Sequence, residues 1–168
     1  LFPVFDYYSS LRKSERRFEI LLPLLVAMVS SAVYVNIGKV SIALDALAEL
    51  LPTAVSILIG FTVMLITLLL TTDSDQISKL KTKITENRVR GKKITLYQKL
   101  HIQLTESLFS EVFLLLTVFA YLFYSGITSV LLTEIAFLLV EVYLTAHILL
   151  GIIRSITHLY CVFYSPQI

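Results

Sequence analysis

Residues 50–72 read LLPTAVSILIGFTVMLITLLLTT, and none of these 23 residues is Asp, Glu, Lys or Arg. A helix of about 20 residues crosses the roughly 30 Å hydrocarbon core of a bilayer, so this stretch is long enough to span a membrane. Three further runs have the same character, namely residues 20–38, 112–133 and 135–153, the last interrupted only by Glu141. Because lipid admits only elements that satisfy their own backbone groups, the sequence predicts an all-α integral membrane protein with four transmembrane helices.

The composition agrees with one transmembrane domain over residues 1–168. Hydrophobic residues make up 57% of the chain and charged residues only 15%, which is outside the usual range for a water-soluble domain. The longest polar segment, residues 73–111, is too short to build an independent core without a disulfide or a metal.

The basic residues lie almost entirely on one side of the predicted spans. Four precede the first span, eight lie from Lys79 to Lys99, and Arg154 follows the last span, whereas Lys39 falls on the opposite side. Lys and Arg are retained in the cytoplasm, so the pattern predicts a membrane protein with both termini cytoplasmic. Residues 73–99 alone carry eight basic and three acidic residues, a local net charge of +5. This segment is either a topology determinant that touches anionic lipid or a docking surface for an acidic partner.

Residues 73–111 are predicted to form a basic cytoplasmic helical hairpin that extends the second and third spans. Apolar residues recur at helical spacing from Ile77 to Ile84, Gly91 marks the turn, and Thr95 caps the returning helix. The candidate partner-binding residues of this hairpin are Lys79, Lys81, Lys83, Arg88, Arg90, Lys92 and Lys93.

Two other segments are expected at the membrane surfaces. Residues 1–19 combine aromatic rings with basic residues and are predicted to be a cytoplasmic N-terminal interfacial segment, either a plain anchor or a binding site. Residues 41–51, SIALDALAELL, are predicted to be an amphipathic helix on the outer surface. Asp45 and Glu49 share one face of it and could also form an acidic patch for cations or an external partner.

Ionisable residues at membrane depth are the candidates for a mechanism, because a charge in hydrocarbon costs roughly 2.5–3.5 kcal/mol and therefore requires a partner. These intramembrane polar residues are Glu111, Glu141, His147 and Arg154. Antiparallel packing of the third and fourth spans predicts an ion pair between Glu111 and Arg154. Glu141 and His147 have three open roles: hydrogen bonds between helices, an aqueous or ion path in an oligomer, or proton sensing.

The motifs of enzyme active sites are missing from the sequence. No His, Cys or carboxylate spacing fits a metal site, and there is no phosphate-binding loop or nucleophile elbow. We therefore expect no catalytic activity, no cofactor and no bound metal. Among residues 73–99, which carry the basic side chains, Tyr97 is the one aromatic residue, so direct contact with nucleic acid is not expected.

The layout resembles the four-helix membrane subunits of prokaryotic anti-phage defence systems, in particular the KwaA-like family of Kiwa membrane subunits. The resemblance covers most of the chain and rests on the pattern of apolar runs and on residues 73–100, DSDQISKLKTKITENRVRGKKITLYQKL. It implies a homo-oligomeric sensor of envelope disturbance that signals to a cytoplasmic effector. We expect the oligomer to be a tetramer. The competing hypothesis is a small oligomeric ion channel or transporter subunit built around Glu141 and His147.

Overall fold

The computed structural model describes residues 2–11, 13–72, 75–89, 91–127 and 130–164. Its elements, in chain order, are α1 (Phe2–Ser10), α2 (Lys13–Ile37), α3 (Val40–Thr71), α4 (Asp75–Thr82), β1 (Ile84–Val89), β2 (Lys92–Thr95), α5 (Leu96–Ser125) and α6 (Leu131–Tyr164). Four of the helices described are long and apolar enough to cross a membrane. This confirms the prediction of a helical fold with four apolar spans and suggests a multi-pass membrane protein.

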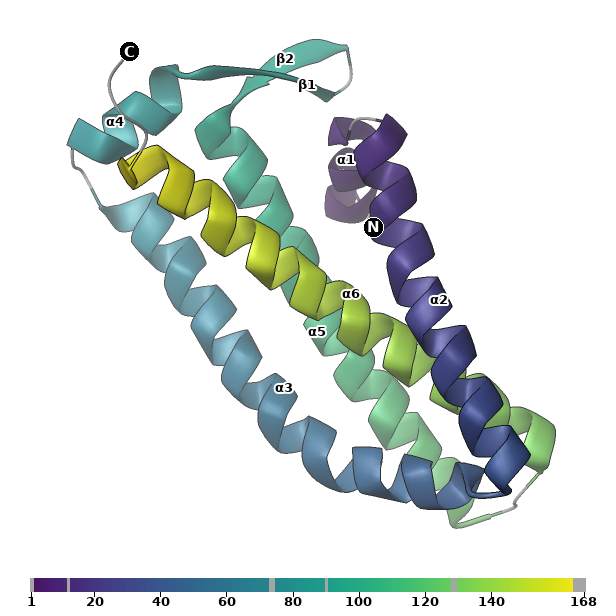
Figure 1. The fold of residues 1–168 in the computed structure, drawn as a ribbon. Helices are drawn as coiled ribbons and strands as arrows, with labels where there is room; N and C mark the ends of the chain where they lie inside the picture. The colour runs from purple at the N-terminus through teal and green to yellow at the C-terminus, as the bar shows by residue number, and fades with distance from the viewer. Residues whose placement is uncertain (1, 12, 73–74, 90, 128–129, 165–168) are drawn as a thin grey trace.

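The four long helices form an elongated bundle with α5 and α6 at its centre (Figure 1). α3 packs mainly on α5, and α2 packs mainly on α6, so these two helices flank the central pair. The main core cluster is apolar and includes Leu44, Val55, Leu114, Val118 and Leu138. Most other large apolar side chains of the spans face outward, as expected of helices whose outer faces contact lipid.

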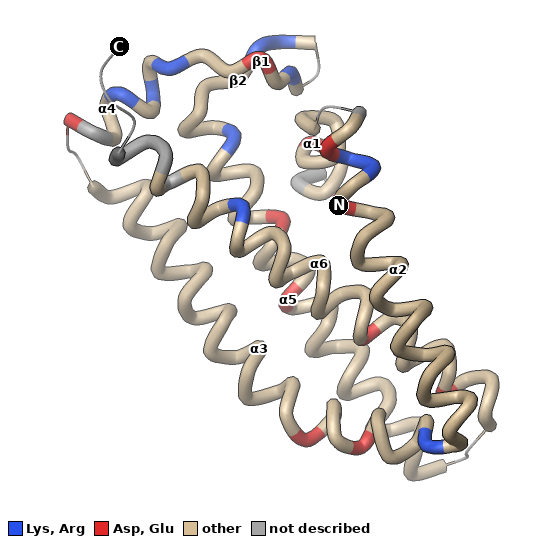
Figure 2. Tube along the Cα trace, viewed as in Figure 1, with Lys and Arg blue, Asp and Glu red and all other residues tan. Residues whose placement is uncertain are grey.

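The basic residues gather at one end of this bundle (Figure 2). That end, called the basic end below, is formed by α4, β1, β2, the first turns of α5 and the start of α2. The opposite end holds the connection between α2 and α3, where Lys39 lies, and the short connection between α5 and α6.

The prediction of a helical hairpin over residues 73–111 is wrong in its central part. α3 ends at Thr71, α4 is a separate two-turn helix, and residues 84–95 form an antiparallel β-hairpin instead of continuing as helix. Val89 pairs with Lys92, and Gly91 in the turn between the strands adopts a φ of +82°. β-Branched residues such as Ile84, Thr85 and Ile94 favour strands over helix here.

Two features of that segment match the expectation nonetheless. Gly91 forms the turn, and Thr95 caps α5 with a complete capping box in which its hydroxyl accepts from the Gln98 backbone N–H. Ile77 and Leu80 of α4 pack against Leu100 and Leu104 of α5 in a second apolar cluster. The helical spacing predicted that Ile84 lies on the same apolar face as Ile77 and Leu80. Ile84 is instead 67% exposed, because it belongs to β1.

The amphipathic helix predicted over residues 41–51 is not a separate surface element. It is the first part of α3, which runs without interruption from Val40 through Pro52 to Thr71. Figure 1 shows α3 bending near its beginning, as a proline inside a helix produces. The bend lays this part of α3 across the end of the bundle, where Leu44 is fully buried and Asp45 accepts a hydrogen bond from the Tyr121 hydroxyl at 2.8 Å.

Candidate functional site

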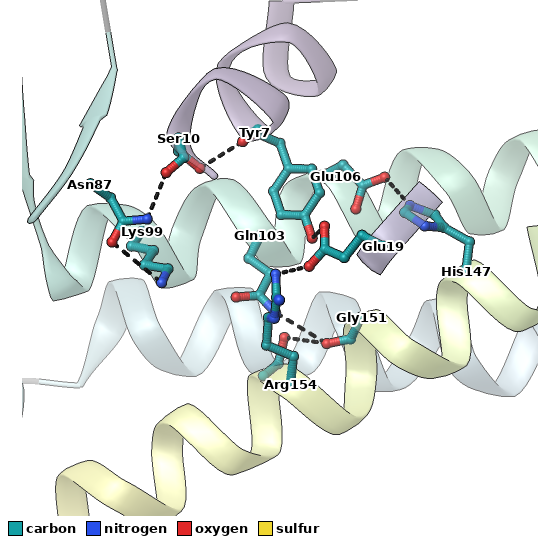
Figure 3. Close-up of polar contacts among 11 residues, drawn as sticks. Tyr7, Ser10, Glu19, Asn87, Lys99, Gln103, Glu106, His147, Gly151 and Arg154 are labelled. Carbon is teal, nitrogen blue, oxygen red and sulfur yellow. Dashed lines mark hydrogen bonds and ion pairs between the residues drawn. The ribbon is translucent and has the colours of Figure 1, made fainter. Parts of the chain in front are cut away.

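A cluster of buried polar side chains lies between α1, α2, α5 and α6 toward the basic end (Figure 3). It contains Tyr7 of α1, Glu19 of α2, Glu106 of α5, and His147 and Arg154 of α6, and is called the polar cluster below. Glu19 is 4% exposed and Glu106 is 3% exposed. Carboxylates this deeply buried are costly unless hydrogen-bonded and paired, so their partners define the site.

The first pair of the polar cluster joins α2 to α6. Glu19 forms an ion pair with Arg154 and also accepts a hydrogen bond from the Tyr7 hydroxyl, at 2.6 Å on its other oxygen. Burial, followed by the nearby Glu106 charge, raises the pKa of the Tyr7 phenol, so the hydroxyl remains a donor. One carboxylate thus holds three helices together.

The predicted ion pair between Glu111 and Arg154 is wrong. Glu111 instead accepts hydrogen bonds from Thr62 of α3 at 2.8 Å and from Ser107 at 3.3 Å. The physical reason is the register of α5 and α6: Gln103 contacts Gly151 and Glu106 contacts His147, which leaves Glu111 several turns away from Arg154. Arg154 forms its ion pair with Glu19, the last residue of the predicted interfacial segment.

The second pair of the polar cluster joins α5 to α6. His147 Nε2 lies 2.9 Å from Glu106 Oε1, which also accepts a hydrogen bond from Ser110 at 2.9 Å. The imidazole ring is nearly parallel to two tyrosine rings, Tyr143 at 6.1 Å and Tyr8 of α1 at 6.4 Å between centroids. Burial, followed by the nearby Tyr143, raises the pKa of the Tyr8 phenol, which keeps this ring neutral as well.

Glu141 lies apart from these pairs. It is fully buried, and neither of its oxygens accepts a hydrogen bond from any residue that the structure describes. With His147 only 5% exposed, neither side chain faces outward to where a neighbouring subunit would pack. A conduction path lined by these two residues would require the helices of the single chain to separate.

α1 connects the polar cluster to the β-hairpin. The Asn87 side chain on β1 donates to the Ser10 carbonyl of α1 at 2.6 Å, and Lys99 of α5 donates to the Asn87 oxygen at 3.5 Å. α1 also carries Tyr7 and Tyr8 into the polar cluster. The expected interfacial segment is therefore largely a folded-back helix, with Tyr7 only 2% exposed although Phe5 is 71% exposed.

The predicted partner-binding residues that the structure describes lie on α4, on the β-hairpin and, in the case of Lys83, between the two. Exposed side chains belong to Lys79, Lys81, Lys83, Arg88, Lys92 and Lys93, while Arg90 lies outside the described residues. Beside Lys92 and Lys93, a groove of about 490 Å³ opens between β2, the first turns of α5 and the end of α3. Its other lining residues are Leu70, Val89, Ile94, Tyr97, Gln98, His101 and Ile102.

Sequence reasoning missed Tyr7, Tyr8, Glu19, Thr62 and Asn87 as members of polar contacts. One signal for Glu19 was available: Glu19, Pro23, Ala27 and Ser31 recur every four residues, and all four are buried. Such a stripe indicates the face of α2 that packs on another helix. No sequence signal identifies Asn87, whose partners lie on other elements.

Comparison with known proteins yields no match to a family model, to a curated protein or to a solved structure. Among the residues described, no group of three or more His, Cys, Asp or Glu side chains is placed to hold a metal ion.

Proposed function

We propose that this chain is a non-enzymatic sensor or scaffold subunit of a prokaryotic inner membrane. In this proposal it crosses the membrane four times, keeps both termini in the cytoplasm, forms homo-oligomers, and recruits or signals to a soluble cytoplasmic partner at its basic end. The resemblance in layout to Kiwa membrane subunits supports anti-phage defence as the setting.

The groove at the basic end is the observation that carries the recruitment proposal. Its lining combines apolar side chains, including Ile94 and Tyr97, with two lysines, Lys92 and Lys93. A partner segment that carries both acidic and apolar side chains would fit this groove. Its apolar side chains would be buried in the groove, and its carboxylates would pair with Lys92 and Lys93. The other exposed basic residues of α4 and β1 would draw such a partner toward the groove by long-range attraction.

Hydrogen bonds supply a route from the spans to this surface. The β-hairpin is tied to α1 through Asn87, and α1 is tied to α2 and α6 through Tyr7 and Glu19. A change in how α2 packs on α6 would therefore alter the seating of α1 and, through it, of the hairpin. Two packing arrangements of the spans would then produce two different conformations of the docking surface.

Site-specific photocrosslinking in cells tests the recruitment proposal. A photoreactive residue at Tyr97 should crosslink a soluble acidic protein, whereas the same residue at Phe123, at the other end of α5, should not. Charge reversal at Lys79, Lys81, Lys83, Lys92 and Lys93 should reduce that crosslink at least tenfold, because each lost attraction becomes a repulsion. The control substitution Lys39→Glu lies at the opposite end and should leave the crosslink unchanged.

Membrane insertion and oligomer size, measured on the same variants, should not change. An undiminished Tyr97 crosslink in the charge-reversed protein would rule out docking on the basic end.

A further inference from the structure

Two grooves, one basic and one apolar, follow each other along α2, and their lining is called the α2 surface below. The basic groove, about 510 Å³, is lined by Arg16, Arg17, Ile20 and Leu21. The apolar groove, about 450 Å³, lies between α2, α5 and α6 and is lined by Leu24, Ala27, Met28, Phe113, Leu139, Val140, Tyr143 and Leu144.

The α2 residues of both grooves share one side of the helix. At 100° per residue they fall within an arc of about 140°, from Arg16 through Leu24 to Leu21. Glu15 points to the opposite side of α2 by the same count. Glu19, the next acidic residue, is buried and paired with Arg154, so it does not neutralise Arg16 or Arg17.

The dimensions of the α2 surface match half a bilayer. From Arg17 to Met28, α2 rises about 17 Å at 1.5 Å per residue. Half of a roughly 30 Å hydrocarbon core is about 15 Å. A molecule with its anionic group at the arginines would therefore extend an acyl chain to the far end of the apolar groove and no further.

The arginines are also placed for a headgroup. Both side chains are exposed at the start of the first apolar span. The Arg16 guanidinium lies 5.9 Å from the centre of the Tyr8 ring, which restricts where it can point. Guanidinium groups bind phosphate oxygens through paired N–H donors, which makes arginine well suited to this contact.

We infer that the α2 surface is a binding site for one anionic phospholipid of the leaflet at the basic end. Its phosphate contacts Arg16 and Arg17, and one acyl chain lies in the apolar groove against Leu24 and Val140. The inference rests on the membrane location in the proposed function but not on the docking of a soluble partner. Because the lipid would contact α2 and α6 together, it would favour the packing in which Glu19 meets Arg154.

Native mass spectrometry of the detergent-purified full chain tests the site. The probes are phosphatidylglycerol and phosphatidylcholine with identical acyl chains, with glycerol phosphate as a headgroup that lacks chains. We expect retention of one phosphatidylglycerol per chain, weaker retention of phosphatidylcholine and none of glycerol phosphate. The double substitution Arg16→Gln and Arg17→Gln should lower phosphatidylglycerol affinity about ten- to thirtyfold, since each basic residue contributes near an anionic surface.

Matched control variants distinguish binding at this site from nonspecific electrostatic attraction of anionic lipid to basic side chains. Lys79→Gln with Lys81→Gln removes the same charge at the same end and should leave lipid affinity within twofold. Val140→Trp, at a side chain 40% exposed in the groove, should weaken both lipids, whereas Leu122→Trp, at a side chain 46% exposed elsewhere, should weaken neither.

Three results would overturn the inference. The first is an equal loss of phosphatidylglycerol affinity in the two double variants that remove charge. The second is undiminished lipid binding by Val140→Trp. The third is a change in oligomer mass with Val140→Trp, which would assign the groove to a second copy of the chain. The Tyr97 crosslink, measured on the Arg16→Gln/Arg17→Gln and Val140→Trp variants, should persist, so failure of the lipid site and failure of partner docking give different outcomes.

Discussion

At the residue scale, the polar cluster shows how buried charges choose their partners. Arg154 pairs with Glu19 of α2, which lies level with it. The two carboxylates of α5 lie farther from the basic end and have other partners: Glu106 contacts His147, and Glu111 accepts hydrogen bonds from Thr62 and Ser107. Each acceptor is therefore matched to a donor on another helix, and loss of one partner would leave the other buried and unpaired.

A double-mutant cycle on Glu19→Gln and Arg154→Gln should reveal this pairing. Each single substitution should destabilise the protein by about 1–3 kcal/mol, because it leaves a buried polar partner unmatched, and Arg154 is partly exposed at 22%. The double variant should be less destabilised than the sum of the two. Thermal unfolding in detergent, followed by circular dichroism, provides the measurement.

The matched cycle on Glu111→Gln and Arg154→Gln should be additive within about 0.5 kcal/mol. Coupling in that second cycle instead of the first would restore the rejected pairing.

At the element scale, the β-hairpin replaces helix at the most polar part of the chain. The apolar face of α4 is buried against Leu100 and Leu104 within two turns, so a longer helix would bury no further apolar surface. The chain then reverses at Gly91 and returns to α5, whose start is set by the Thr95 capping box. This hairpin is what brings Lys92 and Lys93 beside Tyr97 at the groove.

Two glycine substitutions separate backbone strain from packing in this element. An added Cβ would meet no atom within 4 Å at either Gly91 or Gly60, but only Gly91 has a positive φ, +82°. Gly91→Ala should weaken the hairpin by about 1–2 kcal/mol. Gly60→Ala, inside α3, should be neutral or stabilising by up to about 1 kcal/mol. Limited proteolysis between Ile84 and Thr95 should accelerate in the first variant alone, and equal rates would argue against a left-handed turn residue.

At the scale of the whole molecule, α1 closes one side of the polar cluster and touches the β-hairpin. It supplies the Tyr7 donor to Glu19, the Tyr8 ring to His147 and the Ser10 carbonyl to Asn87. A nine-residue helix is too short to be stable alone in water. Its order therefore depends on these contacts, and it should report on the packing of the spans.

The substitution Tyr7→Phe should loosen α1 and β1 together. A hydrogen bond to a charged group contributes about 1.5–3 kcal/mol, so amide exchange in Phe2–Ser10 and in Ile84–Val89 should become at least tenfold faster. Because burial raises the Tyr7 pKa, this contribution is present below the ordinary phenol value of 10.0 and is lost only as pH rises above it. Tyr34→Phe, at a side chain 40% exposed, is the control. Hydrogen exchange that rises in α1 but not in β1 would disprove the coupling.

The amino-acid sequence by itself determined the four apolar helices and the concentration of Lys and Arg at one end. Both are properties of composition along one dimension, since about 20 uncharged residues suffice for a span wherever it packs. Only the tertiary structure decided that Arg154 pairs with Glu19, that His147 pairs with Glu106, and that α1 folds back over both. Those contacts depend on which helices are neighbours and on how each is rotated, and hydropathy carries no information on either. The strands at residues 84–95 were likewise decided by packing, because α4 completes its apolar contacts before the helical pattern ends at Ile84.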